Sequence, residues 1–197
     1  MKKAIVLLCI VVSVLSLTGC EKTPSSQLTP VELSDEVKNT LSELGATPYD
    51  YAFYDYQVDD GIQGLILTYY TMSNDHLWVP AGSLTIDREN GFTSKGQLSV
   101  RMDHNQTIIL NSSERSKTCP IPHPELFDEN QQGSYGTSRL GTKDIVPNQE
   151  IQLMLRISSA EHELEMPDTD QFLDADMSQY RAAICVTVIF FTTKPIG

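Results

Sequence analysis

The segment that decides the fold is "YRAAICVTVIFFT", residues 180–192. It is rich in β-branched and aromatic residues and contains neither glycine nor proline, which makes it the most β-prone stretch of the chain. Side chains alternate between the two faces of a strand. One face would carry Ala182, Ile184, Val186, Val188 and Phe190, and the other Arg181, Ala183, Cys185, Thr187 and Ile189. This pattern predicts a final β-strand.

The same two-residue period recurs upstream of this strand. In "EIQLMLRIS" (150–158), Ile151, Leu153, Leu155 and Ile157 would share one face, opposite Gln152, Met154 and Arg156. Further strands are predicted over 49–61, 62–72, 77–79 with 83–87, 96–102 and 106–111, with a short one inside 134–140. We expect the first two to form a hairpin that turns at Asp59, Asp60 and Gly61.

A single helix is predicted, over residues 30–44. Thr29, Pro30 and Glu32 form a helix-start signature, and Gly45 is placed to end the helix. Its apolar stripe is Leu33, Val37, Leu41 and Leu44. Because no helical pattern follows, a parallel α/β fold is excluded. The fold class is mainly β: an antiparallel sandwich or partly open barrel of about seven or eight strands with one N-terminal helix.

The first nineteen residues have the order of an export signal. Lys2 and Lys3 precede the apolar run 4–17, which would be about 21 Å long as a helix and so short for a bilayer core of about 30 Å. The run ends in Leu17-Thr18-Gly19-Cys20, which resembles the lipobox of bacterial lipoproteins. The resemblance implies cleavage between Gly19 and Cys20 and lipidation of Cys20, whose acyl chains would anchor the protein at the membrane. An uncleaved membrane anchor is the alternative.

The domain organisation follows from this signal. We expect a lipoprotein signal peptide over 1–19, a lipidated N-terminus and tether over 20–29, and one β-rich extracytoplasmic domain over 30–197. The stretch "YDYAFYDYQVDDGIQGLILTYYTMSNDHLW" (49–78) and the terminal "YRAAICVTVIFFTTK" (180–194) are similar to uncharacterised domains of Gram-positive membrane lipoproteins. This resemblance implies a location on the outer side of the cell membrane and no activity.

The charge of the chain argues against one class of partner. The net charge is −12, and it becomes −14 without residues 1–19, which carry two lysines and no acid. Phosphate backbones repel such a domain, so nucleic acid is a poor partner. A cationic partner, Ca²⁺ or solubility alone would each suit this charge.

The cysteines leave two alternatives open. Cys9 departs with the signal and Cys20 carries lipid, so Cys119 and Cys185 remain for a disulfide in an exported domain. The other alternative is a pair of half-buried free thiols. Cys119 also lies near His123 in sequence, a thiol–imidazole pair that an exported enzyme could use.

The remaining motifs are incomplete. His162 and Glu163 begin a zinc-protease motif that lacks its second histidine, and Gly136–Gly141 is one residue too long for a nucleophile elbow. The acidic stretch 161–176 could hold Ca²⁺ but is otherwise a solvated loop. Aromatic residues gathered in 49–78 could form a sugar- or peptide-binding surface, although cross-strand core pairs are the usual outcome. We therefore expect no cofactor and no metal.

These observations together favour a lipid-anchored surface protein. Its domain would act as a binding or envelope-accessory module for a protein or small molecule. The alternative is an exported enzyme with a Cys119–His123 site or a carboxylate pair in 161–176, and the sequence leaves enzymatic activity undecided.

Overall fold

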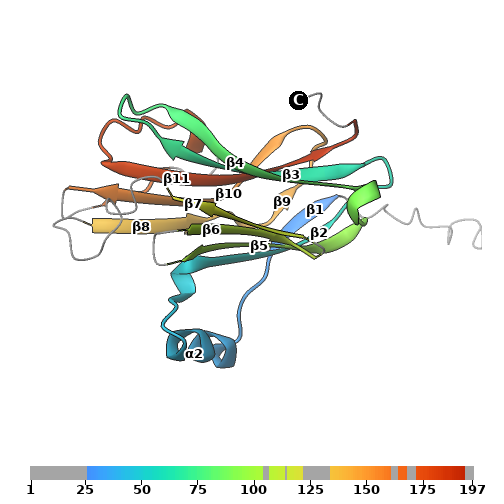
Figure 1. The fold of residues 1–197 in the computed structure, drawn as a ribbon, viewed down its shortest axis with the longest axis horizontal. Coiled ribbons are helices and arrows are strands. Elements are labelled where there is room, and N and C mark those ends of the chain that lie inside the picture. The colour runs from blue at the N-terminus through green and yellow to red at the C-terminus, as the bar shows by residue number, and fades with distance from the viewer. Residues whose placement is uncertain are drawn as a thin grey trace, which may run out of the picture.

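Two antiparallel β-sheets pack face to face in the computed structural model of the chain (Figure 1), which describes residues 26–103, 107–113, 115–121, 134–160, 164–167 and 172–193. The first sheet, sheet A, has the order β7-β6-β5-β2-β1-β9, and sheet B has the order β4-β3-β11-β10-β8. Sheet A contains β1 (Gln27–Pro30), β2 (Tyr51–Gln57), β5 (Lys95–Asp103), β6 (Thr107–Ser112), β7 (Ser116–Pro120) and β9 (Lys143–Asp144). Sheet B contains β3 (Gly64–Met72), β4 (Trp78–Asp87), β8 (Ser134–Arg139), β10 (Glu150–Ser159) and β11 (Ala182–Phe191).

The main core lies between the two sheets. The final strand, β11, occupies the middle of sheet B, and its residues Ala182, Ile184, Val186, Val188 and Phe190 all belong to this core, as predicted. Sheet A contributes residues such as Leu28, Leu98 and Leu110, each fully buried. The hydroxyl of Tyr54 on β2 donates to the carbonyl of Leu153 on β10 at 2.6 Å and so ties the sheets together. The expected β-sandwich is confirmed, and it is not a closed barrel.

One predicted strand pairing is wrong. β2 and β3 do not form a hairpin, because β2 belongs to sheet A and β3 to sheet B. The Asp59–Gly61 connection carries the chain across the end of the sandwich, where Val58 and Ile62 are buried. The backbone N–H of Val58 donates to Ser94, and that of Gln63 donates to Phe191. Pairing on these other strands replaces the hydrogen bonds that a hairpin would have supplied.

The alternation predicted for β10 is broken by a bulge. Its register against β11 shifts between Gln152 and Met154. As a result Leu153 and Met154 both join the main core, whereas Leu155 and Ile157 join a second apolar cluster on the opposite face of sheet B. An extra residue in one strand reverses the facing of every later side chain.

The N-terminal predictions are also corrected. The segment assigned to the end of a tether and the start of a helix is strand β1, which pairs with β2, and Leu28 is fully buried. The helix, α2 (Asp35–Glu43), begins later, with Ser34 as N-cap, accepting from the N–H of Val37. Gly45, at a φ of 75°, follows its C-terminus as predicted. Short 3₁₀ helices complete the described structure: η1 (Pro48–Asp50), η2 (Arg88–Asn90) and η4 (Phe172–Asp174).

The outer face of sheet B is covered by residues 164–167 and 172–177, which we call the strap. Apolar residues of the strap pack on apolar residues of β10 and β11 and form the second cluster with them. The strap residues are Leu164, Met166, Leu173, Ala175 and Met177, and the strand residues include Leu155, Ile157 and Cys185. The Tyr180 hydroxyl donates to the Glu165 carbonyl at 2.6 Å and fastens the strap. This part of 161–176 is therefore not simply a solvated loop: its described acids Glu165, Asp174 and Asp176 are exposed, but its apolar residues are packed.

Candidate binding groove

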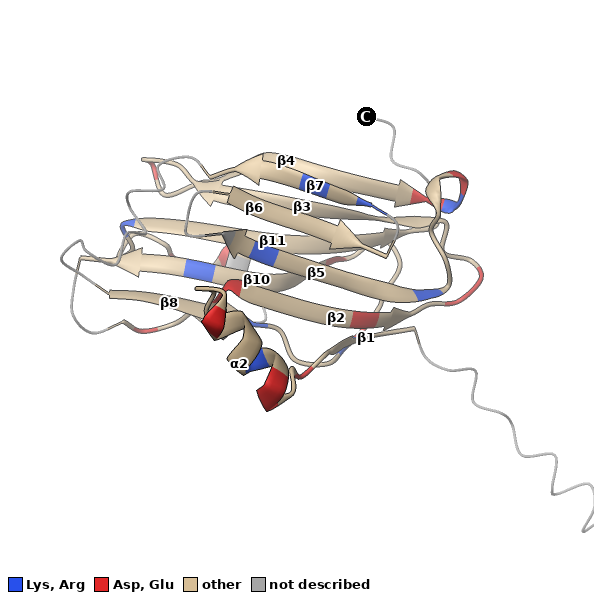
Figure 2. Cartoon of the chain, turned by 60° about the horizontal axis from the view of Figure 1, so that its bottom comes forward, with Lys and Arg blue, Asp and Glu red and all other residues tan. Residues whose placement is uncertain are grey.

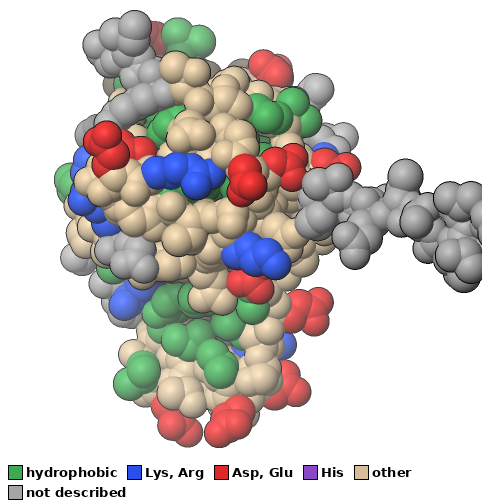
Figure 3. All heavy atoms as spheres, turned by 90° about the vertical axis from the view of Figure 1, so that its right-hand side faces the viewer, with side chains coloured by type: hydrophobic (Ala, Val, Ile, Leu, Met, Phe, Trp, Pro, Cys, Tyr) green, Lys and Arg blue, Asp and Glu red, His purple; other side chains and the backbone are tan. Residues whose placement is uncertain are grey.

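The helix α2 stands at one end of the outer face of sheet A (Figure 2). None of its nine residues is buried, even though its sequence is amphipathic. Val37 and Leu44, from the predicted apolar stripe, are 43% and 75% exposed. Figure 3 shows α2 as a lobe beneath the sandwich, with hydrophobic side chains at its surface. A helix of this length is marginal alone in water, so contacts at its ends must hold it in place.

Between α2 and sheet A lies a groove of about 360 Å³, which we call the α2 groove. This volume lies in the range of ligand pockets, about 300–1,000 Å³. Its lining combines apolar and aromatic residues with charged ones. The lining residues are Pro30, Val31, Glu32, Leu33, Lys38, Tyr51, Phe53, Tyr54 and Arg139.

Two aromatic rings of β2 form the sheet side of the α2 groove. The rings of Tyr51 and Phe53 lie nearly parallel, at an interplanar angle of 4°, with their centroids 5.9 Å apart. They share one face because they are two residues apart on a strand. The guanidinium of Arg101, on the neighbouring strand β5, lies 5.5 Å from the centroid of the Tyr51 ring, within cation–π range. Both rings are half-buried, so each keeps some surface exposed to solvent.

Positive charge gathers at the α2 groove. Its lining carries two cations, Lys38 and Arg139, and one carboxylate, Glu32, and Lys38 also pairs with the exposed carboxylate of Asp35 at 3.4 Å. Burial lowers the pKa of Arg139, and the positive charge of Arg156 lowers it further, while Tyr54, Asp50 and Tyr49 act in the opposite direction. The groove thus brings two cations close together in a chain whose net charge is −12.

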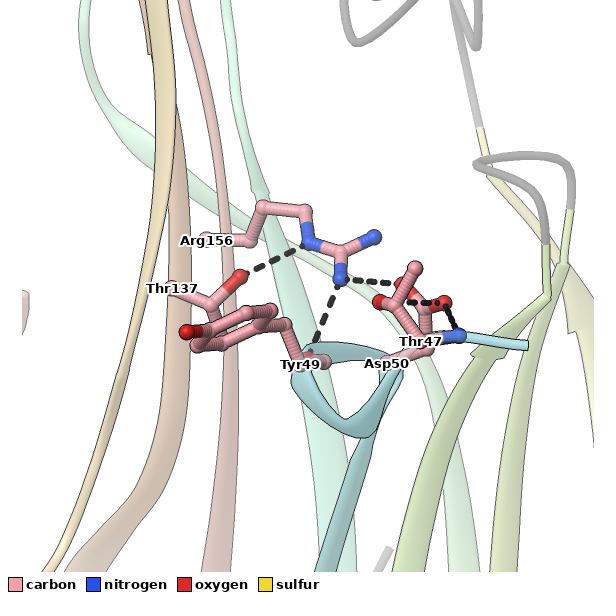
Figure 4. Close-up of polar contacts among 5 residues, drawn as sticks. All are labelled: Thr47, Tyr49, Asp50, Thr137 and Arg156. Atoms are coloured by element: carbon pink, nitrogen blue, oxygen red, sulfur yellow. Dashed lines mark hydrogen bonds and ion pairs between the residues drawn. The ribbon is translucent and has the colours of Figure 1, made fainter. Parts of the chain in front are cut away.

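A buried ion pair fixes the segment that joins α2 to β2 (Figure 4). Arg156, whose side chain is only 1% exposed, reaches from β10 to the carboxylate of Asp50 in η1 at 2.8 Å. The same guanidinium donates to the Tyr49 carbonyl and to the Thr137 hydroxyl. Asp50 also accepts from the backbone N–H and hydroxyl of Thr47, at 3.0 and 2.8 Å.

These contacts set the ionisation of Asp50. Burial acts to raise its pKa, but the hydrogen bonds from Arg156 and Thr47 outweigh burial and hold the pKa below its ordinary value. Asp50 is therefore an anion near neutral pH, as the buried Arg156 requires. The pair anchors η1 to sheet B and thereby sets the position of Tyr51 and the base of α2.

A second, more polar groove lies at the other end of the outer face of sheet A. Its volume is about 820 Å³, and Gln97 there donates to Asp55 at 2.9 Å. Its lining residues are Gln27, Thr29, Asp55, Tyr56, Gln57, Lys95, Gly96, Gln97 and Ser113. Although it is larger, its lining residues are mostly polar in type, whereas aliphatic and aromatic side chains line much of the α2 groove, so we select the α2 groove as the candidate site.

The structure does not join the predicted cysteines. Cys119 on β7 is buried in the main core, Cys185 on β11 is buried in the second cluster, and both thiols are free. A Cys119–Cys185 disulfide is therefore wrong for this structure, because the two side chains belong to clusters on opposite faces of sheet B. Burial, and then the nearby carboxylate of Glu150, raises the pKa of Cys185, so this thiol stays protonated.

Several predicted site residues lie outside the described residues: Gly19, Cys20, His123, His162, Glu163 and three other acids of 161–176. The described acids Glu165, Asp174 and Asp176 lie on the strap, whereas Cys119 lies in the main core, so the structure does not bring them together. Within the described part of the chain, no group of three or more His, Cys, Asp or Glu residues could hold a metal ion.

The charged residues of the α2 groove were missed by the sequence reasoning. Arg156 gave one available signal, a cation inside an otherwise apolar alternating strand, which requires a buried partner. Nothing local links it to Asp50, 106 residues earlier in the chain. The aromatic residues of 49–78 are predicted as a possible binding surface, and of these Tyr51, Phe53 and Tyr54 line the groove.

Comparison with protein-family models, curated proteins and solved structures finds no match to this chain. No helix in the described ranges is long and apolar enough to cross a bilayer.

Proposed function

We propose that this protein is a lipid-anchored, extracytoplasmic binding protein whose ligand occupies the α2 groove. The observation that carries the binding role is the composition of this groove: two parallel aromatic rings, the apolar residues Val31 and Leu33, and two cations line one solvent-accessible cleft. Pockets that bind small ligands combine mostly apolar walls with a few placed polar groups in this way.

The proposed location rests on the sequence Leu17-Thr18-Gly19-Cys20. Six residue steps separate Cys20 from Ser26, the first described residue, and an extended chain covers at most about 3.6 Å per residue. An anchor at Cys20 would thus hold the sandwich within about 22 Å of the membrane surface. The domain would act close to the bilayer as a binding or envelope-accessory module.

The anchor is tested by mass spectrometry of the protein from its native membrane. We expect a chain that begins at Cys20 and carries a diacylglyceryl mass increment, and Cys20→Ser should accumulate as an unprocessed precursor. A wild-type chain that retains Met1 and lacks the increment would refute the anchor.

The binding role is tested by protein-observed NMR of the full-length protein in detergent, titrated with a set of aromatic fragments. Fragments that bind should shift signals of Lys38, Tyr51 and Phe53, and Phe53→Ser should remove the shifts. A matched control is Ser99→Ala, on the same face of sheet A but outside the groove lining. If no fragment shifts the groove signals, the α2 groove is not a binding site.

A further inference from the structure

We infer that the α2 groove selects carboxylates with an apolar aromatic body. This inference rests on the proposed function, because it names the ligand class for the same groove.

The charge of the groove favours an anion over a cation or a neutral molecule. Lys38, whose ammonium also lies 3.4 Å from the exposed carboxylate of Asp35, comes from α2, and Arg139 comes from the end of β8, so two separate elements bring a cation to one cleft. A guanidinium presents two parallel N–H groups that match the two oxygens of a carboxylate, and an ammonium adds a point charge. Since the chain is strongly acidic overall, two cations at one groove are the feature of that groove that would attract an anion.

The rings determine the other end of the ligand. The rings of Tyr51 and Phe53 are stacked nearly parallel, so their exposed parts together form one apolar wall of the groove. Aromatic groups pack on such rings in offset or edge-to-face arrangements, which adds to the gain from area burial. Leu33 and Val31 supply apolar surface on the α2 side of the groove. A flat apolar body would lie against these residues with its carboxylate directed toward Arg139 and Lys38.

The surroundings of Arg139 also favour a ligand carboxylate beside this residue. Burial and the charge of Arg156 both lower the pKa of Arg139. A carboxylate bound beside Arg139 would offset both effects. Arg156 itself is paired with Asp50 and does not line the groove, so its role is to hold η1 in place and not to contact the ligand.

The test compares three probes that share one aromatic body and differ in charge: 2-naphthoate, 2-naphthamide and 2-naphthylmethylamine. Each is titrated into the full-length protein in detergent, and the shifts of the Tyr51 and Phe53 signals give Kd. We expect 2-naphthoate to bind about tenfold or more tightly than the amide, because a charge-assisted hydrogen bond contributes about 1.5–3 kcal/mol and 1.4 kcal/mol is tenfold. The amine should bind most weakly.

Variants that remove one positive charge test whether the preference for naphthoate comes from the groove cations or from the net charge of the protein. Arg139→Gln and Lys38→Gln should each weaken naphthoate several-fold while leaving the amide unchanged. Lys95→Gln is the matched control, since it removes the same charge from an exposed position in the polar groove. Arg139→Lys should keep part of the affinity that Arg139→Gln loses, and unchanged binding of the amide shows that the two Gln variants fold.

The outcomes are distinguishable. If all three probes bind in the groove with equal Kd, the carboxylate preference is wrong and the binding role stands. If Lys95→Gln weakens naphthoate as much as Arg139→Gln does, the preference reflects net charge and the inference is also wrong. If no probe shifts the Tyr51 and Phe53 signals, the inference fails, and the wider fragment set decides whether the groove binds anything else.

Discussion

The two outer faces of the sandwich differ in what covers them. On sheet B, the outward residues Leu155, Ile157 and Cys185 are apolar, and the strap closes over them. On sheet A, outward residues such as Asp55, Gln97 and Lys95 are exposed, and α2 stands over one end with no buried residue of its own. One face is completed as a second core, whereas the other remains available to a ligand.

The close fit at the covered face shows that the strap is structural. A Cβ at Gly136 would lie 2.5 Å from the Leu164 side chain and 2.9 Å from the Met166 sulfur, so the strap packs directly on β8. On the open face, the contacts that matter are at the base of α2, where Asp50 meets Arg156. The comparison predicts that substitutions under the strap and at this ion pair alter stability, and that substitutions on α2 do not.

The largest loss in the free energy of unfolding should come from Arg156→Met. The change leaves the Asp50 carboxylate without its buried cation, which typically costs about 3–5 kcal/mol. Denaturant unfolding should show this loss. The double variant Arg156→Met, Asp50→Leu should recover part of it, because no charge is then left unpaired. A single variant as stable as the wild type would mean that η1 is not anchored by this pair.

The next largest loss of stability should come from a substitution on the outer face of sheet B, which the strap covers. Leu155 is fully buried beneath the strap, so Leu155→Ala should destabilise the fold by about 2–4 kcal/mol through lost burial and a residual cavity. The matched substitution on the open face, Leu41→Ala in α2, should change the free energy of unfolding by less than about 0.5 kcal/mol. Equal losses would show that α2 is packed as tightly as the strap.

A smaller effect should appear in the pH dependence. The folded pKa of Asp50 lies below its ordinary value of 3.8, so the folded state favours the ionised carboxylate. The resulting stability is complete above about pH 5 and is lost as pH falls through the unfolded pKa of about 3.9 toward the folded pKa. Asp50→Asn should therefore lower stability at pH 7, and the difference from wild type should shrink by pH 3. A difference that is constant with pH would contradict this assignment.

The smallest effect is expected on α2 itself. Val37→Ser together with Leu44→Ser should leave the melting temperature within about 2 °C of wild type, since both side chains are already largely exposed. Any larger fall would mean that these residues pack against the body of the protein. Neither residue lines the α2 groove, so naphthoate affinity should also be unchanged.

Much of the fold could be predicted because strand period and turn residues are local signals. The β11, β10, β5 and β8 strands lie within a residue or two of their predicted positions, and the facing of β11 is correct. The errors arose where contacts with segments distant in sequence determine the local structure. Leu28 became a strand residue because β2 and β9 flank it, and the Asp59–Gly61 turn connects two sheets because Phe191 and Ser94 take up the backbone groups beside it.

The candidate site was less predictable than the fold. The aromatic strand was visible in the sequence, but no local signal places Lys38 and Arg139 at one groove or pairs Arg156 with Asp50. The sequence predicts a solvated acidic loop for the strap because its carboxylates are close together and its apolar residues are widely spaced. Those apolar residues become buried only because sheet B lies beneath them.

What the sequence alone determined is the β class, the final strand with its two faces, and the negative charge, because each follows from residue types at short spacing. The tertiary structure decided which face of each sheet is covered and which cations share a groove. These depend on pairing between segments as far apart as Asp50 and Arg156, and no periodicity along the chain encodes such a pairing.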